Sequence, residues 1–122
     1  MQKDAILKIG VLEHKGNTII ANLEINKNSE IFIGHFASHP VLPGACMLQM
    51  VKEVLQFALS LSFRLKRAEH IKFLSLIDPR VHHNLELRLT YQSVGENIVD
   101  VIADFRIQND ICFKFKGSFI TC

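Results

Sequence analysis

The sequence predicts an α+β fold in which an antiparallel sheet wraps around one long central helix. Two observations lead to this prediction. A long, mostly apolar segment begins near Gly44, and most of the remaining chain alternates apolar and polar residues with the period of a half-buried strand. With 122 residues, 48% of them apolar and 21% charged, the chain has the composition of a folded protein. We therefore expect residues 1–122 to form one domain.

The N-terminal part predicts two strands joined by a tight turn. The first is expected over Ile6–Glu13, and Lys15-Gly16-Asn17 has the composition of a hairpin turn. In the second, four apolar residues alternate with polar ones: Ile19, Ala21, Leu23 and Ile25.

The central segment predicts a helix that begins at Pro43 or Gly44. Proline is tolerated at a first helical position because its missing N–H would be unpaired there anyway. The polar residues recur at spacings of three and four, which puts them on one narrow stripe: Gln49, Lys52, Glu53, Gln56 and Ser60. A helix that is apolar on its other three sides fits a sheet that wraps around it.

The second half predicts a run of antiparallel strands. A strand is expected through Ile71, Phe73, Ser75 and Ile77. Three more alternating segments, at residues 85–91, 99–107 and 113–119, are separated by turns at Gly95-Glu96-Asn97 and Asn109-Asp110. Three strands joined by tight turns imply an antiparallel meander. One long helix with such a sheet is an α+β arrangement.

Composition excludes several functional classes. The net charge is only +2 and no long Lys/Arg run occurs, so nothing indicates nucleic-acid binding. No secretory signal is visible, and the most apolar stretch, Gly44–Leu61, contains Lys52 and Glu53 and is too polar to span a membrane. We expect a cytoplasmic protein whose three cysteines, Cys46, Cys112 and Cys122, are reduced thiols without metal-ligand spacing.

The segment from Gly34 to Gly44 is the most informative for function. It places His35 in a loop and ends in Pro43-Gly44, directly before the predicted helix. Helix N-termini present unpaired N–H groups and a positive dipole end, which can stabilise a developing oxyanion. A histidine has a pKa near 6.5 and can take and return a proton near neutrality. The two features together suggest proton abstraction next to a carbonyl group.

The residues Gly34-His35-Phe36, Pro40-Val41 and Pro43-Gly44 resemble the active-site motif of the β-hydroxyacyl-(acyl carrier protein) dehydratases of fatty-acid synthesis. These enzymes have the hotdog fold, an α+β fold that agrees with the pattern above. Ile71-Lys72-Phe73 and Ile77-Asp78-Pro79 resemble the strand and turn that follow the central helix in that family.

The resemblance implies a role for each matching residue. His35 would be the base that takes the proton α to the thioester, and the N–H groups of Gly44 and Ala45 would polarise the thioester carbonyl. Phe36 and Pro40 would shape the loop and the pocket wall. No metal or redox cofactor is needed for this chemistry. The product would be a trans-2-enoyl thioester, formed from a 3-hydroxyacyl chain on acyl carrier protein.

Gln49 departs from the family pattern, which has Glu or Asp at this position. A carboxylic acid can protonate the departing hydroxyl, whereas an amide cannot at any useful pKa. Three interpretations follow. Gln49 positions a water in a weak dehydratase, the chain has lost catalysis and kept acyl binding, or a related chain supplies the acid across a dimer interface. Family sites lie at such interfaces, so we expect a homodimer or higher oligomer, or a heterodimer with a related chain.

Other chemically capable residues fit less specific roles. Glu53, one helical turn beyond Gln49, is either a displaced acid or a solvated residue beside Lys52. His39 falls at a variable motif position and is expected to be structural or exposed, and the His82-His83 pair is weak evidence for a metal. Cys46, near the helix start, is either a thiol of lowered pKa or a small buried apolar residue.

Arg64, Lys66 and Arg67 form a local basic cluster. It is either a docking site for an acidic acyl carrier protein or a solvated helix end whose cations favour the negative end of the dipole.

A dehydratase is therefore the first functional hypothesis, without a firm assignment as an enzyme because of Gln49. A non-catalytic acyl-binding or partner subunit is the second, and a hotdog thioesterase is the third. The expected products distinguish the three: an enoyl thioester, no change, or a free acid and a thiol.

Overall fold

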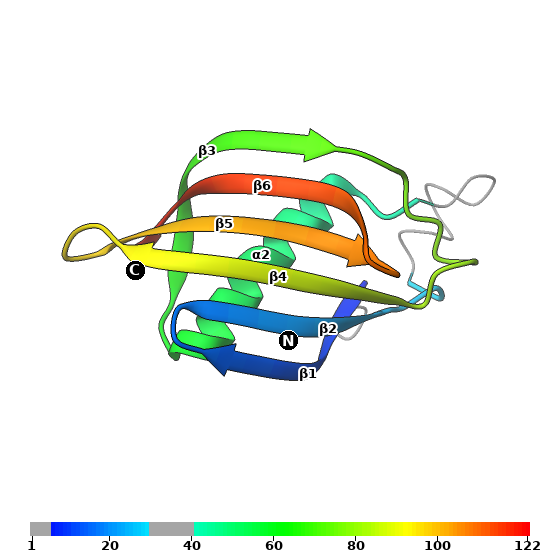
Figure 1. The fold of residues 1–122 in the computed structure, drawn as a ribbon, viewed down its shortest axis with the longest axis horizontal. Helices are drawn as coiled ribbons and strands as arrows, with labels where there is room; N and C mark the ends of the chain where they lie inside the picture. The colour runs from blue at the N-terminus through cyan, green and yellow to red at the C-terminus, as the bar shows by residue number, and fades with distance from the viewer. Residues whose placement is uncertain (1–5, 30–40) are drawn as a thin grey trace.

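The computed structural model describes residues 6–29 and 41–122 and shows one helix and six strands there (Figure 1). In chain order these are β1 (Leu7–Lys15), β2 (Thr18–Ile25), α2 (Gly44–Leu59), β3 (Phe63–Phe73), β4 (Asn84–Ser93), β5 (Ile98–Ile107) and β6 (Asp110–Thr121). None of the helical residues described forms a segment long and apolar enough to cross a membrane.

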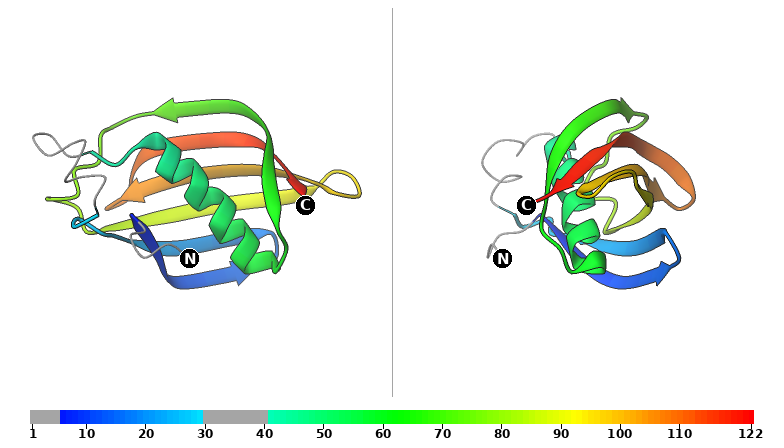
Figure 2. Two further views of the ribbon diagram at one scale, coloured as in Figure 1. Left: turned by 180° about the vertical axis from the view of Figure 1, so that it is seen from behind. Right: turned by 90° about the vertical axis from the view of Figure 1, so that its left-hand side faces the viewer.

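The six strands form one antiparallel sheet in the order β1-β2-β4-β5-β6-β3. The sheet curls around α2, which crosses its concave face diagonally (Figure 2). After the helix, the chain returns to the far edge of the sheet, where β6 is the one described strand that pairs with β3. The predicted α+β layout and the β4–β5–β6 meander are therefore confirmed.

Alternation along the strands selects the face that packs against α2. The inward residues of the four inner strands are almost fully buried, because the helix covers them. They include Ile19, Ala21 and Leu23 of β2, Leu85, Leu87 and Leu89 of β4, Val101 and Phe105 of β5, and Phe113, Phe115 and Phe119 of β6. Helix α2 contributes Met47, Met50, Val51, Val54 and Leu55 to the same core.

The predicted turns lie close to the observed ones. Gly16 joins β1 to β2 with a positive φ of 57°, a conformation that glycine adopts without steric cost. Gln108 and Asn109 join β5 to β6 with φ values of 50° and 74°, so this turn lies one residue earlier than predicted. Asparagine tolerates the left-handed conformation better than most residues, which explains its presence there.

The predicted central helix was longer than the observed one and was expected to be buried on three sides. Helix α2 has 16 residues and ends at Leu59, because Ser60 adopts a left-handed conformation with φ of 55°. Phe57 is one of the apolar residues of this helix, yet 66% of its surface is exposed. The helix is therefore covered by the sheet on one broad side and is open elsewhere.

The segment after the helix also differs from its prediction. Arg64, Lys66 and Arg67 do not form a helix end, because β3 begins at Phe63 and includes all three. Ile71 and Phe73 lie in the same strand as expected, but Ser75 and Ile77 lie beyond its end. Apart from Phe63, every residue of β3 is exposed.

Candidate active site

The start of α2 leaves backbone donors without partners. Pro43 caps the helix with extended backbone and no side-chain hydrogen bond. The N–H groups of Cys46 and Met47 donate to the carbonyl of Pro43 at 3.1 and 3.4 Å. Within the described part of the chain, the N–H groups of Gly44 and Ala45 make no hydrogen bond. These are the two groups expected to polarise a carbonyl, and the helix dipole makes their position favourable for negative charge.

A loop from a distant part of the chain fixes the start of the helix. The N–H of Leu42 donates to the carbonyl of Ile77 at 2.9 Å, and both side chains are buried. The following turn is closed by Arg80, which donates to Asp78 Oδ1 through its backbone N–H at 2.8 Å. Hydrogen bonds from Arg80, first from its side chain, lower the pKa of Asp78. The sequence contained no signal for the Leu42–Ile77 contact, since the two residues are far apart in the chain.

Gly44 has a packing reason to be glycine. A Cβ atom at this position would collide with the ring of Phe73, at the end of β3. The same ring makes an edge-to-face contact with Phe113, with centroids 5.0 Å apart. The absence of a side chain at Gly44 therefore lets the end of β3 approach the first turn of α2.

A small pocket of about 210 Å³ lies between α2 and the β3 side of the sheet. Ala45, Leu48, Gln49 and Lys52 line it from the helix, and Leu65 and Phe119 line it from β3 and β6. The structure thus brings together two predicted site residues, Ala45 and Gln49, which are one helical turn apart on the same face. Its volume is below the roughly 300–1,000 Å³ of typical small-molecule pockets, so it would hold only part of a ligand of that size.

Other predicted site residues are placed less directly. His35 and Phe36, like His39 and Pro40, lie outside the described residues, so their relation to Gln49 stays a prediction. Gly44 lies at the helix start but does not line the pocket. Glu53 is partly buried and is also absent from the pocket lining, which argues against its alternative role as a displaced acid in this pocket.

Lys52 is a pocket residue to which the sequence argument gave no role. The signal was present in its spacing, because Lys52 follows Ala45 by seven positions and Gln49 by three, which keeps all three on one helix face. Its ammonium group is the cationic group among the residues that line this pocket.

Cys46 and the His82-His83 pair do not add to this site. Burial raises the pKa of the half-buried Cys46 thiol, so the alternative of a lowered pKa at the helix start was wrong.

No group of three metal-binding side chains occurs among the described residues. The two histidines line a larger, open groove of about 730 Å³, which shares no lining residue with the Gln49 pocket. Asn22 and Arg106 place that groove on the sheet face opposite the helix.

Comparison with known proteins identifies the family. A model of the ApeI-like family, described as ApeI dehydratase, matches residues 11–116. The chain belongs to the ApeI-like dehydratase family. Among curated proteins, no sequence matches the chain.

Solved structures of similar fold include both dehydratases and thioesterases of the hotdog type. A chain of the dehydratase heterocomplex ApeI:P from Xenorhabdus doucetiae superposes with a TM-score of 0.74 at 18% identity, covering 93% of this chain and 96% of that one. A thioesterase from Haemophilus influenzae gives a TM-score of 0.66 at 16% identity, covering 98% and 80%. At these identities the similarity establishes the hotdog fold, and the family match connects that fold to dehydratases.

Proposed function

We propose that this ApeI-like protein acts on 3-hydroxyacyl thioesters carried by acyl carrier protein, within lipid metabolism of the fatty-acid synthesis type. In the proposed reaction, His35 takes the α-proton and the C3 hydroxyl leaves as water, which gives a trans-2-enoyl thioester. The N–H groups of Gly44 and Ala45 would hold the enolate-like oxygen, with Phe36 against the acyl chain. We propose that residues 1–122 act as one catalytic domain in the cytoplasm.

The observation that carries this proposal is the unpaired start of α2 beside the Gln49 pocket. Two backbone donors point out of a helix N-terminus, and the next turn of the same helix presents Gln49 to an adjoining pocket. Donors in this position stabilise oxygen charge that develops in a transition state. The family match supports assigning this geometry to dehydration.

Gln49 limits what the chain can do alone. Its amide can accept a hydrogen bond from the substrate hydroxyl or hold a water, but it cannot supply the proton that the departing hydroxyl needs. The absence of a general acid costs roughly 10²–10⁴-fold in rate. We infer that the isolated chain is at most a slow dehydratase, and that a partner carboxylate would complete the site.

Turnover of 3-hydroxyacyl-(acyl carrier protein) tests the proposal, with the native chain, His35→Ala and Gln49→Glu assayed together. Enoyl product from the native chain, lost by roughly 10²-fold or more in His35→Ala, is the result expected of a dehydratase. Gln49→Glu should raise the rate because it restores a proton donor. Enoyl formation that is unchanged in His35→Ala would contradict the proposed base.

The alternative function is a non-catalytic acyl-binding or partner subunit, and the exposure of Gln49 in place of an acid favours it. For this function, the native chain gives no product while Gln49→Glu gains activity.

A thioesterase is the third candidate, because hotdog thioesterases are among the similar structures. Release of free acid and thiol, rather than an enoyl thioester, would identify it.

A further inference from the structure

One residue that lines the Gln49 pocket carries a proton that it can give up. Four of the six lining residues have hydrocarbon side chains: Ala45, Leu48, Leu65 and Phe119. The fifth is Gln49, whose amide is not a proton donor at any useful pKa. The sixth is Lys52, whose ammonium group carries three protons. Among the described residues that line the pocket, the transferable proton is therefore on Lys52.

The position of Lys52 brings this proton close to Gln49. Lys52 follows Gln49 by three positions within α2, and residues with this spacing are neighbours on a helix surface, about 5–6 Å apart between Cβ atoms. Helical side chains lean toward the N-terminus, and lysine has a flexible four-carbon stem. The ammonium group can therefore reach back along the helix to the level of Gln49, which is the position where the dehydratase motif has its acid.

Lys52 is not engaged by another charge of the described chain. Four ion pairs lie among the described residues, and none of them includes Lys52. Glu53, the next residue of the helix, is absent from the pocket lining, so no described carboxylate lies in the pocket. Lys52 is also half-buried, which limits the rotamers that its stem can adopt. Within the described part of the chain, its ammonium group is thus available to a ligand in the pocket.

We propose that Lys52 is the proton donor of the reaction, in place of the acid that Gln49 has replaced. This role rests on the proposed dehydratase function. His35 takes the proton from C2 of the substrate, the electron pair of that C–H bond forms the C2–C3 double bond, and the C3–O bond breaks. The ammonium group of Lys52 gives one proton to the departing oxygen, which leaves as water. The neutral amine then takes a proton from solvent, and His35 returns its own proton to solvent.

This donor accounts for dehydration without a carboxylic acid, at a reduced rate. An ammonium group gives up a proton less readily than a carboxylic acid does. Lys52 therefore replaces the missing acid only in part, which agrees with the slow dehydration inferred above for the isolated chain. Its positive charge also stabilises the negative charge that develops on the departing oxygen. Gln49 keeps a separate task, because its amide can hold the hydroxyl group in place.

The test compares turnover of 3-hydroxyacyl-(acyl carrier protein) by the native chain and by variants at position 52. Lys52→Met removes the proton and keeps an unbranched side chain. Lys52→Arg keeps the positive charge, but an arginine does not give up its proton in proteins. The double variant Gln49→Glu, Lys52→Met places a carboxyl group at the position where the family has one.

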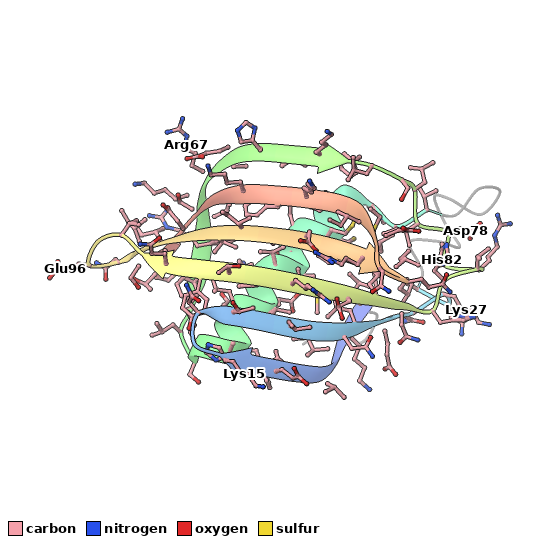
Figure 3. All side chains as sticks on the ribbon, in the orientation of Figure 1. Lys15, Lys27, Arg67, Asp78, His82 and Glu96 are labelled. Carbon is pink, nitrogen blue, oxygen red and sulfur yellow. The ribbon has the colours of Figure 1, made fainter. Side chains whose placement is uncertain are left out.

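Two control variants remove a charge outside the pocket. Glu53→Gln changes the neighbouring residue of the same helix, which does not line the pocket. Lys15→Met removes a lysine at the end of β1, the sheet edge farthest from β3 (Figure 3). Circular dichroism and urea unfolding of every variant would verify that each one folds.

The expected result is a loss that depends on the proton and not only on the charge. Lys52→Met should lower the rate of enoyl formation by roughly 10²-fold, as removal of a general acid does. Lys52→Arg should lose nearly as much, because its charge comes without a transferable proton. Adding Gln49→Glu to Lys52→Met should restore the rate at least to the native value. Both control variants should turn over at the native rate.

Several outcomes would overturn the role of Lys52 without affecting the proposed acyl-thioester site. These are an unchanged rate in Lys52→Met, a native rate in Lys52→Arg, an equal loss in a control variant, or no recovery in the double variant. Product from Gln49→Glu but none from the native chain would overturn it as well. The absence of enoyl thioester from both the native chain and Gln49→Glu would instead overturn the proposed function, and the role of Lys52 with it.

Discussion

Strands β6 and β3 are neighbours and carry apolar side chains opposite one another. Those of β6 are buried, whereas those of β3 are exposed. Phe113 and Phe115 of β6 are fully or almost fully buried, while their cross-strand partners Phe73 and Ile71 are 57% and 42% exposed. These side chains lie on the same face of the sheet, although the register between the two strands shifts twice. The difference arises because α2 covers the centre of the concave face and leaves the β3 edge beyond it. Apolar alternation therefore reports which face of a strand points inward, not whether anything covers that face.

The largest expected difference between the two regions is in stability. Phe113→Ala removes a ring that is fully buried and packed edge-to-face on Phe105, with centroids 5.5 Å apart. We expect a loss of about 3–5 kcal/mol in the free energy of unfolding. Phe73→Ala should cost about 0.5–1.5 kcal/mol, the value of an aromatic pair without a buried cavity. Urea unfolding of both variants measures the two losses of unfolding free energy. Equal losses would show that Phe73 is as well buried as Phe113.

The close contact between β3 and β6 should leave no room for a side chain at Gly117. A Cβ atom there would collide with the carbonyl oxygen of Arg67 on β3 and with the ring of Phe115. We expect Gly117→Ala to cost about 1–3 kcal/mol in unfolding free energy, as overpacked sites do. Gly95→Ala is the matched control, because a Cβ atom there meets nothing within 4 Å. Similar stability of the two variants would mean that β3 moves away from β6 at little cost.

The contact between the open edge and the helix start gives a smaller, coupled effect. Gly44→Ala should displace the Phe73 ring, and the same substitution should cost less when Phe73 is already alanine. A coupling energy of about 0.5–1 kcal/mol from the double-mutant cycle is expected for residues in direct contact. Additive effects would show that the ring does not pack against the helix start in solution.

The reactivity of the cysteine thiols compares a buried position with more exposed ones, and this comparison needs no substitution. Burial raises the pKa of Cys112 on β6 to about 11, and it also raises the pKa of Cys46 in the first turn of α2. Because the thiolate is the reactive form, Cys122, which is exposed, should react first with a thiol reagent at pH 8, then Cys46, then Cys112. Raising the pH above 8 should accelerate Cys112 by about tenfold per pH unit, and the rate should level off as the pH passes its pKa. Fast modification of Cys112 at pH 8 would show that the core opens readily.

Much of the fold could be predicted because several segments have one dominant local signal. The alternation in residues 19–25 and 85–91 gave the correct inward faces, and Pro43-Gly44 marked the start of the helix. The end of the helix was missed because Leu61 and Phe63 continue an apolar pattern, although the chain turns at Ser60. The cations after it were assigned to a helix terminus, because charge alone does not distinguish a helix end from an edge strand.

The candidate site was predictable only in its local part. Ala45 and Gln49 are one turn apart on a helix, so their common face followed from spacing. Leu65 and Phe119, which complete the pocket, come from strands that the sequence argument could not place beside each other.

The sequence by itself determined the elements that depend on neighbours in the chain: strand periodicity, the helix start, the glutamine in place of an acid, and the family to which the motif is similar. Tertiary structure alone decided the order of the strands. It joined Leu42 to Ile77, brought Phe73 against Gly44, and left β3 at the open edge of the sheet. The physical reason is that these contacts join residues distant in sequence, whose proximity depends on how the whole sheet closes around the helix.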